Sequence, residues 1–400
     1  MKKKKVLVFT GNRAEYGLQL PVVKSLNESK KIDCLLMVSG SHLDKKFGET
    51  ISQIKTDKLR IADKIKLNNL YNSRLQTPNL IGQAIIKISK SIYSQKPDIF
   101  LVNADRFETF AATIASTQLS IPTFHIEGGD TTEGGALDDS VRHAITKLSH
   151  IHFATNNSSY QNIINSGEEK WRVHNVGLPI NDMIYNKDFA DFETLQKKFN
   201  IDKKKPLLIL TQHSVTTEPH NSKNQIKITL LAIKYFIDKY NCQVVATYPN
   251  NDVGSSDIIF ELEKFKRENK NFYLFKSLGN YFYHSLMNLR KIMNVVIVGN
   301  SSSGIKEAIA FKCPTLNIGS RQNGRLKPKN VIDVDYNFLK ICSKLKIIIF
   351  SKNLKKQLLK FRNPYYKKST GYRITKVIEN IKLDAKILKK KYKFNIKNGF

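Results

Sequence analysis

The stretch Val6-Leu-Val-Phe-Thr10, followed by Gly11-Asn-Arg13, decides the fold predicted for this chain. A short apolar run without alternating polar residues is typical of a strand buried on both faces of a parallel sheet. The polar residues after it mark the carboxyl end of that strand, where a loop leads into a helix-length segment. The chain therefore begins as a strand–loop–helix unit of an α/β fold.

Similar short β-rich runs alternate with longer amphipathic stretches along the rest of the chain. In the first half these runs cover Cys34–Ser39, Asp98–Ala104, Pro122–Glu127, Ile151–Ala154 and Val173–Gly177. After a polar connection they resume at Leu207–Leu210, Val244–Thr247, Phe272–Phe275, Val295–Val298 and Thr315–Ile318. Buried strands separated by helix-length segments predict parallel, doubly wound sheets. We expect two Rossmann-like domains, residues 1–178 and 179–371, followed by a terminal segment, 372–400.

Composition agrees with a globular, non-exported protein. The 400 residues suffice for two domains, and 41% are hydrophobic, enough to form packed cores. No apolar run approaches the roughly 20 residues of a membrane span, and no signal peptide follows the N-terminal lysines. The four cysteines lie far apart, which fits buried thiols in a reducing compartment. We therefore predict a cytoplasmic location.

The formal net charge of +32 could attract nucleic acid, an anionic membrane surface or an anionic small molecule. No basic module with interleaved aromatic residues stands out, so we favour a generally solvated basic surface, represented by Lys203 to Lys205, over a nucleic-acid footprint. The dense run from Lys382 to Lys397 is the exception. We expect it to be a loose tail that touches phospholipid or other acidic partners.

Ligands of open parallel sheets bind outside the carboxyl ends of the strands. Polar clusters follow predicted strands there in both halves of the chain. They are Gly11-Asn-Arg13, Asn103 to Arg106, Glu127 to Asp130, Thr211-Gln-His213 and Gly299 to Gly304. We expect a ligand cleft between the two domains.

The segment Gly299-Asn-Ser-Ser-Ser-Gly304 leaves a strand and enters a helix, so its backbone amides can face a diphosphate. A plain Ser-capped helix start explains the same residues. Glu307 can hydrogen-bond a ribose diol or serve as a first-turn carboxylate. Arg13 can donate to phosphate oxygens. Neither the dinucleotide fingerprint nor the P-loop pattern occurs, which argues against NAD and ATP.

Three carboxylates form the chemically interesting set: Asp105, Glu127 and Asp138. At strand ends such groups can act as acids and bases, although each alone is as readily explained as a helix cap. Asp139 leaves open which of the adjacent pair points inward. His213 can contact phosphate, act as an acid, or be an ordinary loop histidine.

Four motifs resemble the hydrolysing UDP-N-acetylglucosamine 2-epimerases. They are Thr10-Gly-Asn-Arg-Ala-Glu-Tyr-Gly17, HIEGGDTTEGGALDDSVRHAITKLSH from His125 to His150, Gly299-Asn-Ser-Ser-Ser-Gly-Ile305 and Asn317-Ile-Gly-Ser-Arg-Gln-Asn-Gly-Arg325. The likeness covers nearly the whole chain. It implies a GT-B architecture, with a last helix that returns to the first domain, and a homodimer without cofactor or metal.

The resemblance also implies the reaction. A base removes the proton beside the N-acetyl group while UDP departs, and water adds to the resulting glycal to release the 2-epimeric sugar for sialic- or legionaminic-type acids. Carried over by motif, Asp105, Glu127 and Asp138 are acid/base candidates, and His213 lies near the leaving phosphate. The substrate-binding candidates are Arg13, His42, Ser301, Ser302, Ser303, Gly304 and Glu307, with Arg321 and Arg325 on a mobile loop.

Two departures from the family pattern bear on this expectation. Ile309 stands where the family often has proline, and Glu133-Gly-Gly135 looks like an addition to the central loop that would bear on sugar recognition. The amino sugar, and the choice between UDP and GDP, stay open. Three other readings remain: a GT-B glycosyltransferase with a UDP-sugar donor, a basic nucleic-acid-binding protein, and a catalytically silent nucleotide-sugar sensor.

Overall fold

The computed structural model describes residues 2–44, 50–68, 75–133, 136–186, 188–250 and 252–393, with the side chains of residues 13, 14, 136 and 137 left out. The chain divides into two compact units. Unit 1 comprises Met1–Thr131, Asp138–Met183 and Tyr365–Phe400, and unit 2 comprises Thr132–Leu137 and Ile184–Pro364. The sequence analysis placed its boundaries at 178/179 and 371/372.

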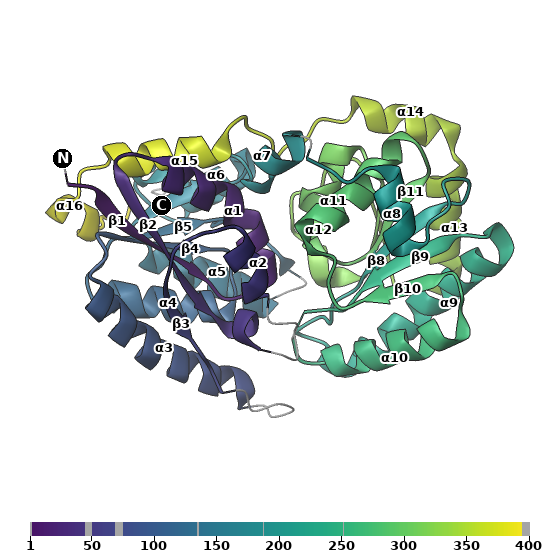
Figure 1. Ribbon diagram of the computed structural model, residues 1–400, viewed down its shortest axis with the longest axis horizontal. Coiled ribbons are helices and arrows are strands. Elements are labelled where there is room, and N and C mark those ends of the chain that lie inside the picture. The colour runs from purple at the N-terminus through teal and green to yellow at the C-terminus, as the bar shows by residue number, and fades with distance from the viewer. Residues whose placement is uncertain are drawn as a thin grey trace, which may run out of the picture. The chain divides into compact units, whose positions relative to one another are not determined.

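Unit 1 is built on a seven-stranded parallel sheet in the order β3-β2-β1-β4-β5-β6-β7. Helices lie on both of its faces (Figure 1). Its strands are β1 Lys4–Thr10, β2 Ile32–Ser39, β3 Ile61–Ile65, β4 Ile99–Asn103, β5 Thr123–Ile126, β6 Ile151–Ala154 and β7 Val173–Asn175. Its helices are α1 Arg13–Glu28, η1 Gly40–Leu43, α2 Ile51–Thr56, α3 Gln76–Gln95, α4 Phe107–Gln118, α5 Ala136–Leu148, α6 Asn157–Asn165, η4 Lys170–Arg172, α7 Ile180–Tyr185, α15 Thr370–Asn380 and α16 Ala385–Leu388.

Unit 2 repeats the plan with a six-stranded parallel sheet in the order β10-β9-β8-β11-β12-β13. Its strands are β8 Leu207–Thr211, β9 Gln243–Thr247, β10 Phe272–Phe275, β11 Val295–Gly299, β12 Thr315–Ile318 and β13 Val331–Val334. Its helices are α8 Phe192–Phe199, η5 Pro219–Asn221, α9 Ser222–Tyr240, α10 Ser255–Glu268, α11 Gly279–Asn288, η6 Leu289–Lys291, α12 Ser302–Lys306, η7 Ala308–Phe311, η8 Ser320–Gln322, α13 Phe338–Phe350 and α14 Lys352–Lys360. The two doubly wound sheets confirm the predicted fold class.

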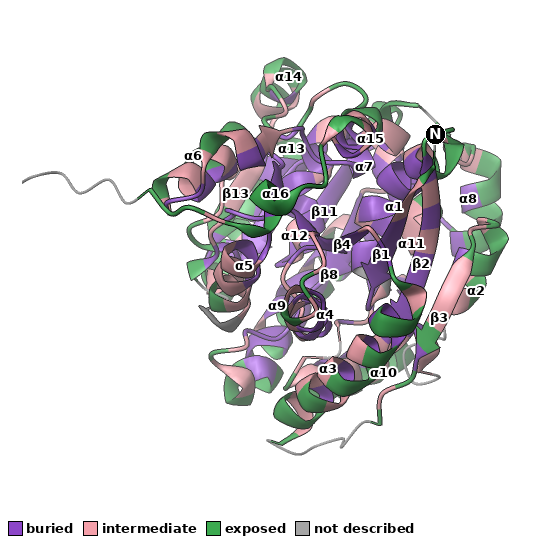
Figure 2. Cartoon of the chain, turned by 90° about the vertical axis from the view of Figure 1, so that its left-hand side faces the viewer, coloured by how far each residue is buried: buried purple, intermediate pink, exposed green. Residues whose placement is uncertain are grey.

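Every run predicted as a strand is one: the central strands are apolar on both faces, and the edge strands β7 and β10 were also predicted. In Figure 2, β1 and β4 are buried, whereas the outer faces of α3 and α10 are exposed. The sequence analysis missed β3 and β13. Both are edge strands, and their sequences Ile-Ala-Asp-Lys-Ile and Val-Ile-Asp-Val carry charged residues because one side of each faces no further strand.

The return of the C-terminal segment to unit 1 is fixed by charged side chains. Helix α15 packs on α1, and the carboxylate of Asp182 accepts hydrogen bonds from the N–H groups of Thr370 (2.9 Å) and Gly371 (2.8 Å) at the start of α15. At its other end, Lys4 Nζ donates to the carbonyls of Ile378, Glu379 and Ile381 at 2.7–2.9 Å. Both ends of α15 are thereby capped by other parts of unit 1.

The basic C-terminal run is docked as far as Lys393, so the expectation of a loose tail is wrong for this part; residues 394–400 lie outside the described residues. Arg172, fully buried, donates to the carbonyls of Ile387, Lys386 and Lys389 at 2.8–3.0 Å. Lys390 Nζ reaches the Glu168 carboxylate (2.9 Å) and the carbonyls of Lys147 and Ser149. Lys390 of this segment therefore supplies the hydrogen bonds that these acceptors of unit 1 need.

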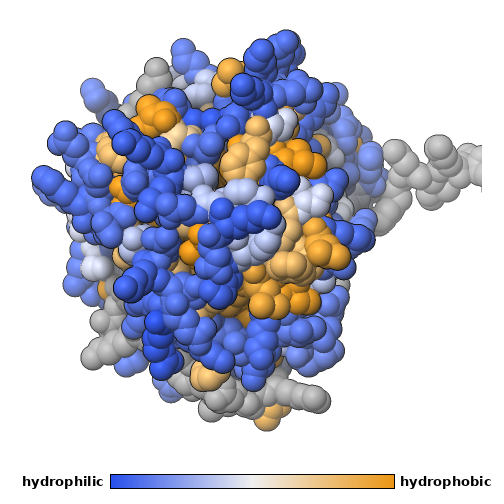
Figure 3. Space-filling view, turned by 90° about the vertical axis from the view of Figure 1, so that its right-hand side faces the viewer, coloured by the Kyte–Doolittle hydropathy of each residue, from blue (hydrophilic) through white to orange (hydrophobic). Residues whose placement is uncertain are grey.

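The surface fits the basic composition. Figure 3 shows a largely hydrophilic face on which apolar residues gather in patches. Lys203 and Lys204 are exposed, as predicted, and Lys205 is partly buried. Among the described residues, no helix is long and apolar enough to cross a membrane.

We predict that Lys390→Met lowers the free energy of unfolding of unit 1 by about 3 kcal/mol, because it leaves the buried Glu168 carboxylate with one cation fewer. The single tryptophan, Trp171, lies 4.2 Å from the Arg172 guanidinium and 4.9 Å from Lys386 Nζ, so its fluorescence reports on this region during urea unfolding. Lys389→Met, at an exposed neighbour, is the control and should change little. Equal effects of the two variants would contradict a role for Lys390.

Candidate functional site

The strand order places the predicted residues at the switch point of each sheet. In unit 1 the chain winds one way from β1 through β2 to β3 and the other way from β4, so the loops after β1 and β4 diverge at neighbouring strand ends. In unit 2 the same holds for β8 and β11. Arg13 and Asp105 follow β1 and β4, while His213 and Ser301 follow β8 and β11. The residues that the sequence analysis singled out therefore follow the strands at which the strand order of each sheet reverses.

Two non-glycine residues with left-handed backbone stand side by side at this edge of unit 1. Ala104 after β4 has φ 63° and Glu127 after β5 has φ 68°. The Ala104 N–H donates to Ile126 O (3.0 Å), which ties the two turns together. Each such conformation costs roughly 1 kcal/mol or more, and residues of this kind gather at functional sites. The turns hold the predicted acid/base residues Asp105 and Glu127, and Glu127 is only 4% exposed.

His125, the residue two positions before Glu127, forms hydrogen bonds that hold these turns in place. It is fully buried, and burial lowers the pKa of its imidazole to about 3, so the ring is neutral at physiological pH. Its Nε2 lies 2.8 Å from Ala104 O, so Nε2 carries the proton and donates to that carbonyl. Its Nδ1 then accepts from Thr146 Oγ1 at 3.3 Å. His125 thereby connects the turns that hold Asp105 and Glu127 to helix α5.

Arg142 on α5 collects the acidic groups of this edge. Its buried guanidinium forms an ion pair with Asp105 and donates to Asp139 Oδ1 (2.7 Å) and to Asp130 O (2.9 Å). Burial alone would lower the pKa of Arg142, but the surrounding carboxylates, Asp105 foremost, outweigh it and raise the pKa. The arginine stays charged, and it holds Asp105 at a fixed place beside α5.

The adjacent carboxylates of α5 have different surroundings. Asp139 is engaged by Arg142 and lies 3.4 Å from His143 Nε2, whereas neither contact involves the partly buried Asp138. The structure therefore brings Asp139 into the Arg142 cluster. The assignment of Asp138 as the acid/base residue stays a prediction.

Of the two residues of unit 1 predicted to contact the substrate, the structure describes the side chain of His42 but not that of Arg13. His42 in η1 is fully buried, with Nε2 2.9 Å from Thr10 Oγ1 and Nδ1 2.7 Å from Thr50 Oγ1. Both ring nitrogens thus already contact protein, which favours a role in holding the β1 and β2 loops. Arg13 is the first residue of α1, and its side chain lies outside the described residues.

In unit 2 the serine loop is tied to α11. Ser301 caps α12, and its Oγ lies 2.9 Å from Ser303 Oγ, which in turn lies 2.7 Å from Tyr283 Oη. Ser302 begins the helix. Gly304 packs on β12, where a Cβ would come within 2.7 Å of Thr315 Cγ2. The loop is thus a hydroxyl-rich turn whose glycine is required by packing.

Glu307 follows α12 and pairs with a histidine that the sequence analysis did not single out. His284 Nε2 on α11 lies 2.6 Å from Glu307 Oε2, and both side chains are largely buried. Because a carboxylate can only accept, Nε2–H of His284 is the donor. The pair fixes the carboxylate predicted to contact the ribose. Ile309, the departure from the family pattern, is fully buried, in keeping with an effect on packing.

His213 is held by its ring as well as by its backbone. The Asn250 N–H donates to His213 Nδ1 (3.0 Å), so the neutral ring carries its proton on Nε2. Its backbone N–H and C=O both bond to the side chain of Asn300. The predicted loop arginines are linked to the same asparagine. Arg321 donates to Asn300 O (3.2 Å), and Arg325 donates to Oε1 of Gln322 (2.9 Å), whose Nε2 donates to Asn300 O.

A family sequence profile described as UDP-N-acetylglucosamine 2-epimerase matches residues 24–379. The chain is 33% identical to the UDP-N,N'-diacetylbacillosamine 2-epimerase (hydrolyzing) of Legionella pneumophila, over 97% of this chain and 98% of that protein. It is 32% identical to the GDP/UDP-N,N'-diacetylbacillosamine 2-epimerase (hydrolyzing) of Campylobacter jejuni, over 85% of this chain and 86% of that one. The chain belongs to the UDP-N-acetylglucosamine 2-epimerase family.

Solved epimerases share the fold. The UDP-N-acetylglucosamine 2-epimerase of Neisseria meningitidis, solved with UDP-N-acetylglucosamine, superposes with a TM-score of 0.79 at 20% identity, over 94% of this chain and 99% of that one. The enzyme of Methanocaldococcus jannaschii gives 0.76 at 19% identity, over 94% and 99%. The likeness confirms the two Rossmann-like domains of the GT-B type. The family match and the two relatives above 30% identity show that the protein is an enzyme of the nucleotide-sugar 2-epimerase class.

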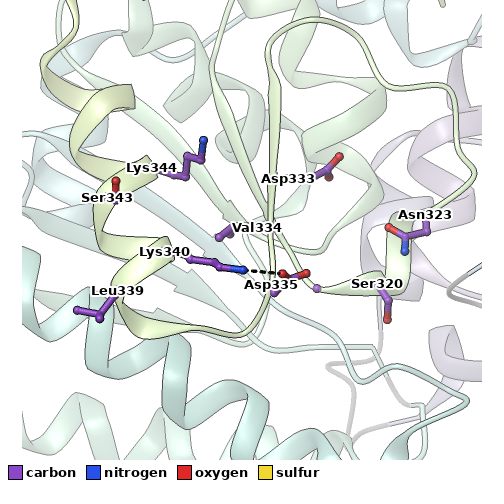
Figure 4. A pocket seen from close by; sticks show the side chains of 10 residues that line it. Ser320, Asn323, Asp333, Val334, Asp335, Leu339, Lys340, Ser343 and Lys344 are labelled. Atoms are coloured by element: carbon purple, nitrogen blue, oxygen red, sulfur yellow. Dashed lines mark hydrogen bonds and ion pairs between the residues drawn. The ribbon is translucent and has the colours of Figure 1, made fainter.

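A separate pocket of this epimerase contains none of the predicted site residues. Its volume is about 630 Å³, and it lies in unit 2 between the loop after β12, the end of β13 and the start of α13. Figure 4 shows Lys340 directed at Asp335, with Asp333 and Lys344 on the rim. Cations and carboxylates are mixed in its lining, so the pocket presents no single charge to a ligand.

Three buried histidines of unit 1, His125, His150 and His152, and the partly buried His174 have lowered pKa values. Burial lowers the pKa values of His125 to about 3, of His150 and His152 to about 4, and also lowers that of His174. An unfolded histidine has a pKa near 6.5, so the unfolded chain binds more protons between about pH 6.5 and 4. This contribution to stability is complete above pH 6.5 and is lost as the pH falls through that window.

We predict that the free energy of unfolding, measured by urea titration with Trp171 fluorescence, falls steeply between pH 6.5 and 4.5, by up to about 1.4 kcal/mol per pH unit for each histidine. His150→Gln keeps an acceptor for the Thr123 N–H, which now donates to His150 Nδ1 at 3.0 Å, and should make the pH dependence shallower. His220→Gln, at an exposed site, is the control. Equal slopes in wild type and His150→Gln would contradict this origin.

Proposed function

We propose that this enzyme is a hydrolysing 2-epimerase, which converts a UDP-linked N-acetylated hexosamine to the free 2-epimeric sugar and UDP. The observation that carries the proposal is the similarity, over 97% and 85% of this chain, to two relatives whose names include that activity. The arrangement of carboxylates in unit 1 and neutral donors in unit 2 supports it, because elimination needs a base at the sugar and hydrogen bonds at the leaving diphosphate.

In this proposal, Asp105, Glu127 and Asp138 act on the sugar. One carboxylate takes the C2 proton as the C1–O bond to UDP breaks, and the electron pair forms the C1–C2 double bond of a glycal. Water then adds its hydroxyl to C1 and gives its remaining proton to a carboxylate, while a carboxylic acid delivers a proton to the opposite face of C2. Arg142 holds Asp105 in place through their ion pair.

The nucleotide is proposed to meet groups of unit 2. Nε2–H of His213 donates to the departing phosphate oxygen, because Asn250 holds Nδ1 as the acceptor. The diphosphate contacts Ser301, Ser302 and Ser303, and the ribose contacts Glu307. Gly304 lets the loop pack closely, and further substrate contacts come from Arg321, Arg325 and, in unit 1, Arg13. These contacts need no cofactor or metal.

We propose UDP-2,4-diacetamido-2,4,6-trideoxyglucose as the better substrate and UDP-N-acetylglucosamine as the poorer one. The relatives at 33% and 32% identity are named for the diacetamido sugar, while the Neisseria meningitidis UDP-N-acetylglucosamine 2-epimerase is 29% identical over 83% of this chain. The free sugar would feed nonulosonic (legionaminic- or sialic-type) acid synthesis. The four free cysteines support a cytoplasmic enzyme, and the family resemblance supports a homodimer.

Proton NMR in heavy water tests reaction and substrate together. We expect UDP and a free 2-epimeric sugar with deuterium at C2 from both nucleotide sugars, and a kcat/KM at least about tenfold higher for the diacetamido compound, since one buried polar substituent is worth a kcal/mol or more. GDP-linked sugars are the control for the nucleotide. If the UDP-sugar stays unchanged until a sugar acceptor is added, the protein is a glycosyltransferase and the proposal is wrong.

We predict that Glu127→Gln lowers kcat by about 100-fold or more and leaves the affinity for UDP within about threefold, because it removes an acid/base group and keeps its shape. UDP release and calorimetric UDP binding measure the two effects. Glu193→Gln, at an exposed position of α8, is the matched control. Undiminished kcat in Glu127→Gln would remove this residue from the chemistry.

A further inference from the structure

Asn300 lies at the switch point of unit 2 and is fully buried. It is the first residue after β11, which pairs with β8 in the sheet (Figure 1). Gly299 before it has φ 119°, and a Cβ there would come within 2.1 Å of Thr211 O. Only glycine lets the two strand ends approach so closely, and the approach brings Asn300 against the residues that follow β8.

The side-chain amide of Asn300 bonds to both backbone groups of His213. Asn300 Oδ1 accepts from the His213 N–H at 2.7 Å, and Nδ2 donates to His213 O at 2.9 Å. A primary amide is the side-chain group that offers an acceptor and a donor side by side, so it matches one peptide residue at both ends. Together with the Asn250 N–H on Nδ1, this clamp leaves the His213 backbone and ring little freedom.

The backbone carbonyl of Asn300 holds the second loop of the site. It accepts from Gln322 Nε2 at 2.8 Å and from Arg321 Nη1 at 3.2 Å. Asn300 also donates from Nδ2 to Tyr336 Oη at 3.4 Å. One buried residue therefore joins the loop after β8 to the loop after β12, and both loops carry groups proposed to meet the leaving diphosphate.

We propose that Asn300 is a positioning residue for the epimerase reaction: it aims His213 and Arg321 at the departing phosphate without contacting the substrate itself. This inference rests on the proposed function. It goes beyond that function in assigning to Asn300 a role that differs from those of Ser301 and Ser303, whose hydroxyls contact each other and, for Ser303, Tyr283.

Asn300→Asp tests the clamp with almost no change of shape. The aspartate keeps the acceptor for the His213 N–H but, when ionised, places a second oxygen against the His213 carbonyl. We expect kcat to fall roughly 10- to 100-fold at pH 8 with KM within about threefold, because a small displacement of a catalytic group costs this much. At lower pH the protonated acid can donate to that carbonyl, so the loss should shrink.

The matched control is Asn330→Asp. Asn330 is equally buried in unit 2 and donates from Nδ2 to a backbone carbonyl, that of Cys313, at 2.7 Å. The same chemical change is therefore made in the same unit, away from His213. Equal losses in the two variants, or no loss in Asn300→Asp, would overturn the proposal. Thermal unfolding of both variants checks that each is folded.

A double-mutant comparison separates positioning from packing. If Asn300 acts through His213, adding Asn300→Asp to His213→Gln should lower kcat by less than about threefold further, whereas independent effects would multiply. Nitrogen-15 NMR of the His213 ring supplies a readout that needs no turnover: we expect the Nε2–H form in wild type and a mixture in Asn300→Asp. Unchanged ring spectra would refute the clamp, while an inactive wild type with the expected spectra would refute only the proposed function.

Discussion

The pairing of β1 with β4, and of β8 with β11, is the constraint on which the rest of the molecule depends. At each of these pairs the order of the parallel strands reverses, so the two following loops leave in opposite directions and expose the ends of both strands. Backbone groups at such ends have lost their sheet partners, and side chains must take their place. Every residue to which we assign chemistry lies on a segment that follows one of the strands of these two sheets.

The two units satisfy this requirement with different chemistry. Unit 1 uses neutral His125 to hold carbonyls and charged Arg142 to collect carboxylates. Unit 2 uses the uncharged amide of Asn300 and the hydroxyls of its serines. Carboxylates that exchange protons with a sugar must be held at fixed places, whereas a leaving diphosphate is stabilised by hydrogen-bond donors aimed at its oxygens. The difference in supporting residues therefore follows the division of labour proposed for the reaction.

The sequence predicts the fold well because central strands of parallel sheets are apolar on both faces, and their carboxyl ends locate the candidate residues. The sequence-based prediction fails for edge strands, and for side chains whose partners lie far away along the chain. The edge strands β3 and β13 lack the continuous apolar run. Arg142 looks like a solvent-facing helix residue until Asp105, far earlier in the sequence, is brought beside it. The docking of Lys390 on Glu168 is equally invisible, because a lysine-rich run predicts solvent exposure.

Asn300 shows what a motif alone cannot reveal. In Gly299-Asn-Ser-Ser-Ser-Gly304 the serines and glycines attract attention, since they are the residue types that cradle phosphate. Yet Ser301 and Ser303 largely contact each other and α11, and Gly304 is explained by its packing on β12. The residue that reaches His213 is the asparagine, because its amide alone has the donor and the acceptor that a backbone residue presents at both ends. The motif that is proposed to contact the diphosphate therefore also supports the histidine proposed to donate a hydrogen bond to the leaving phosphate, which is why its first side chain is buried and not directed at a ligand.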